Sequence, residues 1–261
     1  MDLPLPGQQS EQERRAERRR IATAALISAA FVTLLWWIAL AQHAFELPLR
    51  GLTLRPGELS GLIGVLTAPL LHGSIGHLAS NSLPLLLLGS LALASLPRAA
   101  PRAILLIWLL SGLGTWLIGR PSAHLGASGL GHGLMFFLFI AGLIRRDRAA
   151  IAAAMLVFFL YGGMLLTVLP REEGVSWEYH LCGAVAGVLA AWRWARLDPT
   201  PPRRRYSWED EPEEEPQPDQ ELELPAPRDV PVLWQREQPA PPSGGQVIAF
   251  PPRRQSDDRA D

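Results

Sequence analysis

The chain has 261 residues, of which 48% are hydrophobic and 19% charged, and its formal net charge is −1. The 24 basic residues, all Arg, are balanced by 25 acidic residues, which argues against nucleic acid as a partner. The single cysteine excludes an intramolecular disulfide framework and any zinc site built from several cysteines.

The charge is distributed unevenly along the chain. Residues 1–198 carry a net charge of +5, whereas residues 199–261 carry −6 and contain 14 of the 24 prolines. A segment of that composition buries too little apolar surface to offset the loss of chain entropy on folding. We therefore expect an Arg-rich cytoplasmic N-terminus at 1–20, a helical membrane domain at 21–198, and a disordered cytoplasmic tail at 199–261.

The tail also contains a short apolar interruption, from Val230 to Trp234. Such an interruption is compatible with a motif that binds a soluble partner. A featureless solvated tail is the favoured interpretation.

Six apolar stretches follow one another in the first part of the chain. Residues 21–41 contain no charge, and about 20 helical residues cross a ~30 Å hydrocarbon core. The other five stretches are 77–97, 103–119, 125–144, 149–169 and 179–197. Because backbone polar groups in lipid must be satisfied internally, we expect an all-α membrane protein with a six-helix bundle. The first stretch exceeds the roughly 7–15 residues of a signal-peptide core, which favours a retained helix over a cleaved signal.

The arginines predict how this bundle is oriented. They cluster before the first span, between the second and third, between the fourth and fifth, and after the sixth, whereas the opposite loops hold few. Because positive residues concentrate on the cytoplasmic side, both termini are predicted to be cytoplasmic. Basicity from Arg alone and short loops favour a bacterial cytoplasmic membrane.

Three groups of polar and small residues stand at the starts of spans 2, 4 and 6. Polar side chains are costly in lipid, so they are candidates for function. These three spans run from outside to inside, so their N-terminal ends share one depth. The candidates are His72, His77 and Asn81 in the first group, Gly126, Ser128, Gly129 and His132 in the second, and His180, Gly183 and Gly187 in the third.

The spacing within these groups predicts which residues share a helix face. His77 and Asn81 are four residues apart, as are Ser128 and His132. Gly183 and Gly187 form a small-xxx-small pair that permits close helix packing. Close approach of spans 4 and 6 would bring His180 toward Ser128.

A Ser, a His and further donors at one buried depth suit acyl transfer. A Ser hydroxyl becomes a nucleophile when a base such as His accepts its proton, and the oxyanion needs preorganised donors. Gly126 and Gly129 permit a tight backbone around Ser128, whose neighbouring N–H groups could act as such donors. Glu178 is the only acidic residue near these ends, which favours a Ser–His dyad over a triad, with no metal or cofactor required.

These residues resemble the rhomboid intramembrane serine proteases over roughly residues 21–197. The resemblance rests on three motifs, His-x4-His-x3-Asn from His72, Gly-x-Ser-Gly from Gly126, and His-x2-Gly-x3-Gly from His180. It implies that Ser128 is the nucleophile and His180 the general base.

The same resemblance implies that His77 and Asn81 join the Ser128 amide in an oxyanion hole and that His72 is a supporting residue. It also implies that the substrates are single-span membrane proteins. Their cleavage point would have a small residue in a locally unstable helix.

The chain departs from the rhomboid pattern at two places. Many rhomboids have a Trp-Arg pair in the first loop, where this chain has Ile63 and Gly64. Many also place Tyr four residues after the nucleophile, where this chain has His132, which is titratable and could alter the pKa of the base or compete for the Ser proton.

Two other function classes compete with a protease. A non-catalytic rhomboid-like protein that binds membrane clients typically lacks the Ser or the His, and this chain keeps both. A small transporter or channel would predict buried acidic residues or paired broken helices, and neither is evident in the sequence.

Overall fold

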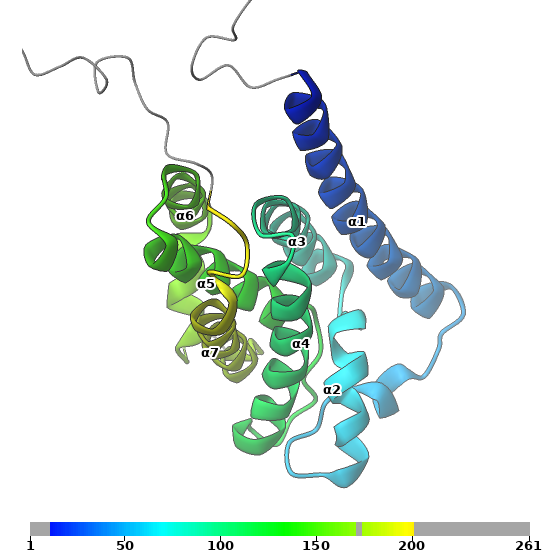
Figure 1. Ribbon diagram of the computed structural model, residues 1–261. Helices are drawn as coiled ribbons and strands as arrows, with labels where there is room; N and C mark the ends of the chain where they lie inside the picture. The colour runs from blue at the N-terminus through cyan, green and yellow to red at the C-terminus, as the bar shows by residue number, and fades with distance from the viewer. Residues whose placement is uncertain (1–10, 171–173, 201–261) are drawn as a thin grey trace, which may run out of the picture. The chain divides into compact units, whose positions relative to one another are not determined.

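A computed structural model describes residues 11–170 and 174–200, and within them the chain is helical apart from its loops and one β-bridge. The long helices are α1 (Glu11–Ala44), α3 (Ile75–Ser95), α4 (Ala99–Ile118), α5 (Ser128–Arg145), α6 (Arg148–Tyr161) and α7 (Trp177–Trp194) (Figure 1). The short ones are η1 (Leu49–Leu52), η2 (Leu59–Ile63), α2 (Gly64–Thr67), η3 (Ala68–Leu70) and η4 (Gly162–Val168). Residues 1–10 and the tail from 201, including the predicted motif at Val230 to Trp234, lie outside the described residues.

Among the described residues, five helices are long and apolar enough to cross a membrane, namely α1, α3, α4, α5 and the continuous segment Arg148–Val168. The chain is therefore an integral membrane protein. The sixth predicted span is also a helix, α7, but it is not among these five because Glu178, His180 and Arg193 make it more polar. It packs against α5 and α4, and its other side exposes apolar side chains such as Val185, Leu189 and Trp192.

Local interactions explain where several helices begin and end. The helix α3 begins after Ser74, whose hydroxyl oxygen accepts a hydrogen bond from the His77 amide at 3.1 Å. The helix α5 begins three residues later than the predicted start at 125, because Gly126 has a φ of 111° that no helix accommodates. The helix α1 begins at Glu11, ten residues before the predicted apolar span, so its Arg-rich first turns are helical too.

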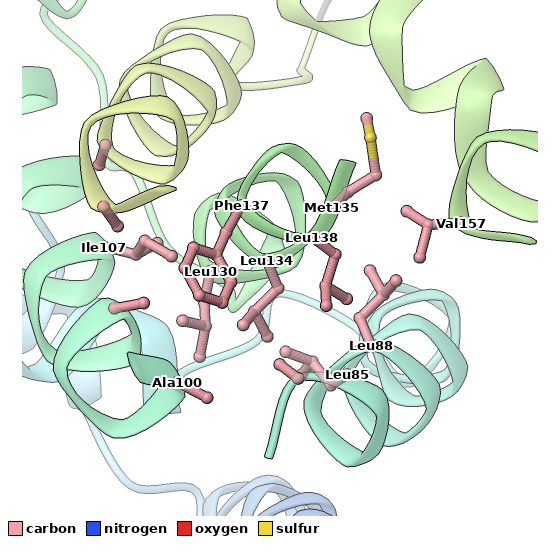
Figure 2. Close-up of a cluster of buried hydrophobic side chains, with 14 of the residues drawn as sticks. Leu85, Leu88, Ala100, Ile107, Leu130, Leu134, Met135, Phe137, Leu138 and Val157 are labelled. Atoms are coloured by element: carbon pink, nitrogen blue, oxygen red, sulfur yellow. The ribbon is translucent and has the colours of Figure 1, made fainter. Parts of the chain in front are cut away.

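The helix α5 is the centre of the bundle and packs against α7, α6, α4 and α3. Most of its residues are buried, and Figure 2 shows Leu134 and Leu138 directed toward Leu85 and Leu88 of α3. By contrast, α1 packs mainly along α3, at the edge of the bundle. The N-terminus of α5 is therefore held from several sides.

The backbones of α5 and α7 touch through glycines. A Cβ atom at Gly183 would overlap the carbonyl oxygen of Gly129, and one at Gly187 would overlap that of Gly133. No side chain therefore fits at either position of α7 while the helices keep this separation. This contact brings the N-terminal turns of the two helices together.

Hydrogen bonds join the helices at the other end of the bundle, where α4 begins and α5 and α7 end. The carboxylate of Asp198 accepts hydrogen bonds from the amides of Arg98 and Ala99, at 2.9 and 3.0 Å, and so caps α4. The guanidinium of Arg145 donates to the carbonyls of Ala195 and Asp198, at 3.0 and 2.8 Å. The segment after α7 is thereby tied to α4 and α5.

Two alanine substitutions on α5 test the glycine contact. In Gly133→Ala the new methyl group overlaps Ile107 and crowds the carbonyl of Gly183, whereas in Gly131→Ala it meets only the end of Met164, at 3.7 Å. Overpacking costs roughly 1–3 kcal/mol, while alanine in an open helical position gains up to about 1 kcal/mol over glycine. We expect Gly133→Ala to lower the midpoint of SDS-induced unfolding in mixed micelles and Gly131→Ala to keep or raise it. Equal midpoints for the two variants would contradict the glycine contact.

Candidate active site

Ser128 and His180 meet where α5 and α7 begin. Ser128 is the first residue of α5, and its Oγ lies 2.9 Å from His180 Nε2. The other ring nitrogen of His180, Nδ1, lies 3.0 Å from the carbonyl oxygen of Thr167 in η4. Because a carbonyl only accepts, Nδ1 carries the proton and Nε2 is left as an acceptor for the Ser128 hydroxyl.

The ring of His132 lies flat against that of His180. Their centroids are 3.9 Å apart and their planes differ by 11°. His132 is 3% exposed, with Nδ1 placed 2.7 Å from the Ser128 carbonyl and Nε2 placed 2.7 Å from the Thr167 hydroxyl. His132 is thus fixed by hydrogen bonds on both edges as well as by stacking.

The first predicted group packs against the turn that precedes Ser128. A Cβ atom at Gly126 would lie 2.5 Å from Cε1 and 2.7 Å from Nε2 of His77, so the imidazole occupies the space that a side chain would need. The His72 ring contacts His77 edge to face, with centroids 5.2 Å apart. Burial and the neighbouring His77 lower the pKa of His72 to about 4, so His72 is neutral at pH 7.

Asn81 follows His77 by one helical turn and is buried. Its side-chain nitrogen, Nδ2, has no hydrogen-bond partner within residues 11–170 and 174–200. A buried amide donor without a partner is costly, so this N–H group is available to an oxygen acceptor.

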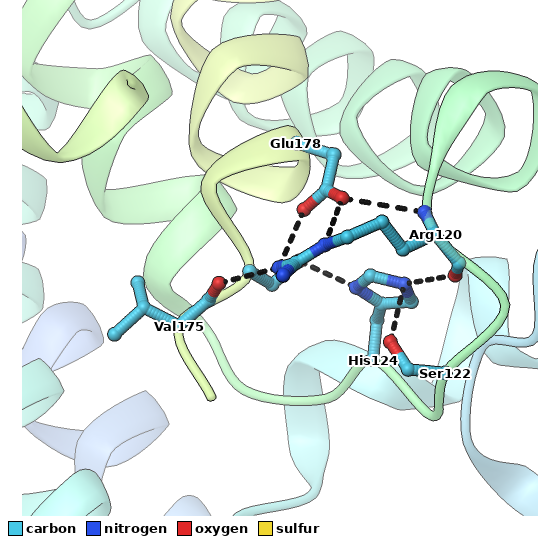
Figure 3. Close-up of polar contacts among 6 residues, drawn as sticks. Arg120, Ser122, His124, Val175 and Glu178 are labelled. Carbon is cyan, nitrogen blue, oxygen red and sulfur yellow. Dashed lines mark hydrogen bonds and ion pairs between the residues drawn. The ribbon is translucent and has the colours of Figure 1, made fainter. Parts of the chain in front are cut away.

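A cluster that we call the loop clasp joins the chain before α5 to the chain before α7, and Figure 3 shows it. Its members are Arg120, Ser122, His124, Val175, Ser176 and Glu178. The Glu178 carboxylate accepts from Arg120 Nε at 2.6 Å and from the Arg120 amide at 3.2 Å. These hydrogen bonds raise the pKa of the Arg120 guanidinium.

His124 completes the loop clasp. Its Nδ1 is hydrogen-bonded to the Ser176 hydroxyl, and its Nε2 lies 3.0 Å from the Arg120 carbonyl. Because His124 precedes Ser128 by four residues and Glu178 precedes His180 by two, the loop clasp holds the two segments that lead directly to Ser128 and His180.

Among the residues that the structure describes, no group of three His, Cys, Asp or Glu side chains converges as a metal site would require.

The comparison with protein families decides the classification. A rhomboid domain model matches residues 59–197, which is more than half of the chain. The chain belongs to the rhomboid family. The prediction of the family from the three motifs is therefore confirmed.

Similar proteins are found in mycobacteria. Proteins of Mycobacterium bovis and Mycobacterium tuberculosis are 45% identical to this chain over 172 residues, which cover 62% of this chain and 71% of theirs. A protein of Mycobacterium leprae is 41% identical over 172 residues, which cover 62% of this chain and 68% of its own. All three are described as uncharacterized, so they indicate a bacterial membrane but assign no activity.

The first loop of this rhomboid is anchored without a Trp-Arg pair. Gly64 is one of the two residues that stand where many rhomboids have that pair. It packs so closely on Leu54 that a Cβ atom at Gly64 would overlap the backbone of Leu54. Leu54 in turn pairs with His124 of the loop clasp through two backbone hydrogen bonds, of 3.0 and 2.8 Å. Two tryptophans of α4 also donate to loop carbonyls, Trp108 to Leu66 and Trp116 to Glu58. The loop is thus tied to α4 and to the chain before Ser128.

Sequence reasoning missed several residues that hold this site, among them Arg120, Thr167 and Ser176. Glu178 offered a signal for Arg120, because a lone acid at a membrane boundary requires a cation and Arg120 stands in a nearby loop. Thr167 and Ser176 belong to no motif and gave no such signal.

Substitutions that remove a charge from the loop clasp are predicted to lower the stability of the protein by different amounts. The Glu178 side chain is 1% exposed and that of Arg120 48%. Arg120→Met therefore leaves a carboxylate buried without its cation, whereas Glu178→Gln leaves a guanidinium that water can solvate. We expect Arg120→Met to lower the midpoint of thermal unfolding most. The double variant with both Arg120→Met and Glu178→Gln should lower it less than Arg120→Met alone.

Arg55→Met is the matched control for this series. Arg55 pairs with Glu58 at 3.6 Å, but both side chains are well exposed, so the pair contributes little. We expect its unfolding midpoint to stay close to that of the unmodified protein. A greater loss in Glu178→Gln than in Arg120→Met would be inconsistent with a buried, charged Glu178.

Proposed function

We propose that this rhomboid is an intramembrane serine endopeptidase that uses Ser128 as nucleophile and His180 as general base. The observation that carries the proposal is the 2.9 Å separation of Ser128 Oγ and His180 Nε2, with His180 Nδ1 bonded to a carbonyl. That arrangement is the one a Ser–His dyad needs, since the base must present a lone pair to the hydroxyl. Both residues also match the rhomboid motifs.

The proposed reaction proceeds through an acyl-enzyme. Ser128 Oγ attacks the carbonyl carbon of the scissile peptide while its proton passes to His180 Nε2. The tetrahedral intermediate collapses with cleavage of the C–N bond, and His180 returns the proton to the leaving amine. Water then attacks the ester with His180 again as base, which releases the acid product and regenerates Ser128.

The proposed oxyanion donors come from two elements. Ser128 opens α5, and Ala127 at the N-cap has no side-chain oxygen to accept from the N–H groups of the first turn. Asn81 supplies the unpartnered Nδ2 described above, and His77 lies against Gly126, two residues before Ser128. His72, buried beside His77, is assigned a supporting role in holding that ring.

We further propose that α7 crosses the membrane as a sixth span. Its 18 residues extend about 27 Å at 1.5 Å per residue. An even number of spans places both termini on the same side of the membrane, and the arginine distribution predicts that this side is cytoplasmic. The Ser128–His180 pair then lies toward the outer face of a bacterial cytoplasmic membrane.

The proposed substrates are single-span membrane proteins. A peptide carbonyl inside a stable helix is already hydrogen-bonded, so the cleaved segment must become extended before Ser128 can reach it. A small residue at the cleavage point and a locally unstable helix, as the family resemblance implies, would meet this requirement. A soluble partner of the tail remains a separate prediction.

Labelling with a fluorophosphonate tests the dyad without a known substrate. The purified protein in lipid nanodiscs is expected to be labelled, and Ser128→Ala to lose the label completely. His180→Ala is expected to slow labelling by about 10²–10⁴-fold, because the general base is lost. Ser90→Ala is the control, since its hydroxyl donates to the Leu86 carbonyl of its own helix, and it should label like the unmodified protein.

Two outcomes of this labelling experiment would overturn the proposal. Equal labelling of Ser128→Ala and the unmodified protein would exclude Ser128 as nucleophile. A folded protein that resists several fluorophosphonates of decreasing size would favour the alternative, a rhomboid-like protein that binds membrane clients without cleaving them.

The oxyanion assignment gives a separate prediction. Asn81→Leu keeps the branching of the side chain but replaces the amide, including the Nδ2 donor, with methyl groups, so we expect the labelling rate constant to fall by about 10²-fold. Ser80→Ala, on the adjacent position of α3, removes a hydroxyl that donates to the His77 carbonyl and serves as control. An Asn81→Leu protein that labels as fast as Ser80→Ala would remove Asn81 from the oxyanion hole.

A further inference from the structure

Thr167 contacts both imidazoles of the site, although it belongs to none of the three motifs. It lies in η4, the 3₁₀ segment that continues α6. Its carbonyl oxygen lies 3.0 Å from His180 Nδ1, and its hydroxyl oxygen lies 2.7 Å from His132 Nε2. One residue outside α5 and α7 therefore joins the two stacked rings.

The hydrogen bonds close into a ring that begins and ends at Ser128. The Ser128 hydroxyl is hydrogen-bonded to His180 Nε2, and His180 Nδ1 is hydrogen-bonded to the Thr167 carbonyl. The Thr167 hydroxyl is hydrogen-bonded to His132 Nε2, and His132 Nδ1 lies 2.7 Å from the Ser128 carbonyl oxygen. We call this ring of four residues the Thr167 bridge.

The protons in this ring can be assigned from the acceptors. The carbonyls of Ser128 and Thr167 have no hydrogen to donate, so His132 and His180 must each carry a proton on Nδ1. In a neutral imidazole the Nε2 atom is then an acceptor. His132 Nε2 therefore accepts from the Thr167 hydroxyl, and His180 Nε2 accepts from the Ser128 hydroxyl.

The Thr167 hydroxyl has two acceptors within reach but only one hydrogen. Its second neighbour is the Met164 carbonyl, at 2.9 Å. The Met164 carbonyl also interacts with His132, but it has no hydrogen to donate, so the Thr167 hydroxyl is the donor for the Nε2 lone pair of this 3% exposed side chain. Leaving that nitrogen unpaired would carry the larger cost, so donation to His132 is favoured.

We propose that Thr167 is a positioning residue for the dyad, an inference that rests on the proposed function. Its carbonyl selects the His180 tautomer that presents a lone pair to Ser128. Its hydroxyl, held by His132, keeps that carbonyl in place. Thr167 acts through His180 and touches no reacting atom itself.

Two substitutions at Thr167 separate its hydroxyl from its carbonyl. Thr167→Val removes the hydroxyl and keeps both the backbone and the branched shape, whereas Thr167→Ser retains the hydroxyl. Thr115→Val is the matched control, because that hydroxyl donates at 2.8 Å to the Ser111 carbonyl of its own helix. His132→Phe removes both ring nitrogens and keeps a planar ring against His180.

Two measurements on these variants test the Thr167 bridge. The first is two-bond ¹H–¹⁵N spectroscopy of histidine-labelled protein in nanodiscs, which distinguishes Nδ1–H from Nε2–H tautomers without any substrate. We expect Nδ1–H forms for His132 and His180 in the unmodified protein, and mixed tautomers of His180 in Thr167→Val. The second is the fluorophosphonate rate constant, which should fall about tenfold in Thr167→Val and His132→Phe and recover largely in Thr167→Ser.

The results that overturn the inference are distinct from those that overturn the proposed function. If Thr167→Val has the same fluorophosphonate rate constant and the same His180 tautomer as Thr115→Val, the Thr167 hydroxyl does not position the dyad. A Thr167→Ser protein as slow as Thr167→Val would assign the loss to packing instead of the hydroxyl. If the unmodified protein takes no label, the proposed function fails, and the tautomer of His180 in Thr167→Val alone decides whether the bridge exists.

Discussion

The contact between the backbones of α5 and α7 is the constraint on which the site depends. Lipid provides little hydrophobic drive for two helices to associate, so close packing and polar contacts must hold them together. Gly183 and Gly187 lie directly on the carbonyls of Gly129 and Gly133, which fixes both the separation and the register of the two helices. In that register the first residue of α5 faces the first turn of α7, and the Ser128 hydroxyl meets His180.

The loops that precede these two helices are held by hydrogen bonds to other parts of the protein. Non-helical backbone at the edge of a membrane is tolerated where other protein segments bond to it. The loop before α5 bonds to the start of α7 through Arg120, Glu178 and His124, and it pairs with the first loop through Leu54. The irregular segments therefore support one another, and together they hold the two helix starts in the register that the glycines permit.

Regular helices made much of this architecture predictable. Span length and topology alone predict that Ser128 and His180 lie at one depth, because both begin helices of the same direction. The same reasoning did not anticipate that α1 begins at Glu11, since a helix can continue into charged residues beyond an apolar span. It also missed Thr167 and the partner of Glu178. Their contacts are made by a 3₁₀ segment and a loop, whose geometry no periodic pattern determines.

His132 links the helical part of the site to this irregular part. A Tyr at this position, as in many rhomboids, has one hydroxyl at the end of an apolar ring, whereas a buried imidazole has two nitrogens that both require partners. The Ser128 carbonyl can satisfy only the nitrogen that donates, so the other must accept from a second element, and η4 supplies the Thr167 hydroxyl. The residue that stacks on His180 and the segment that orients His180 therefore depend on each other. The orientation of the His180 ring consequently depends on contacts with η4 as well as on α5 and α7.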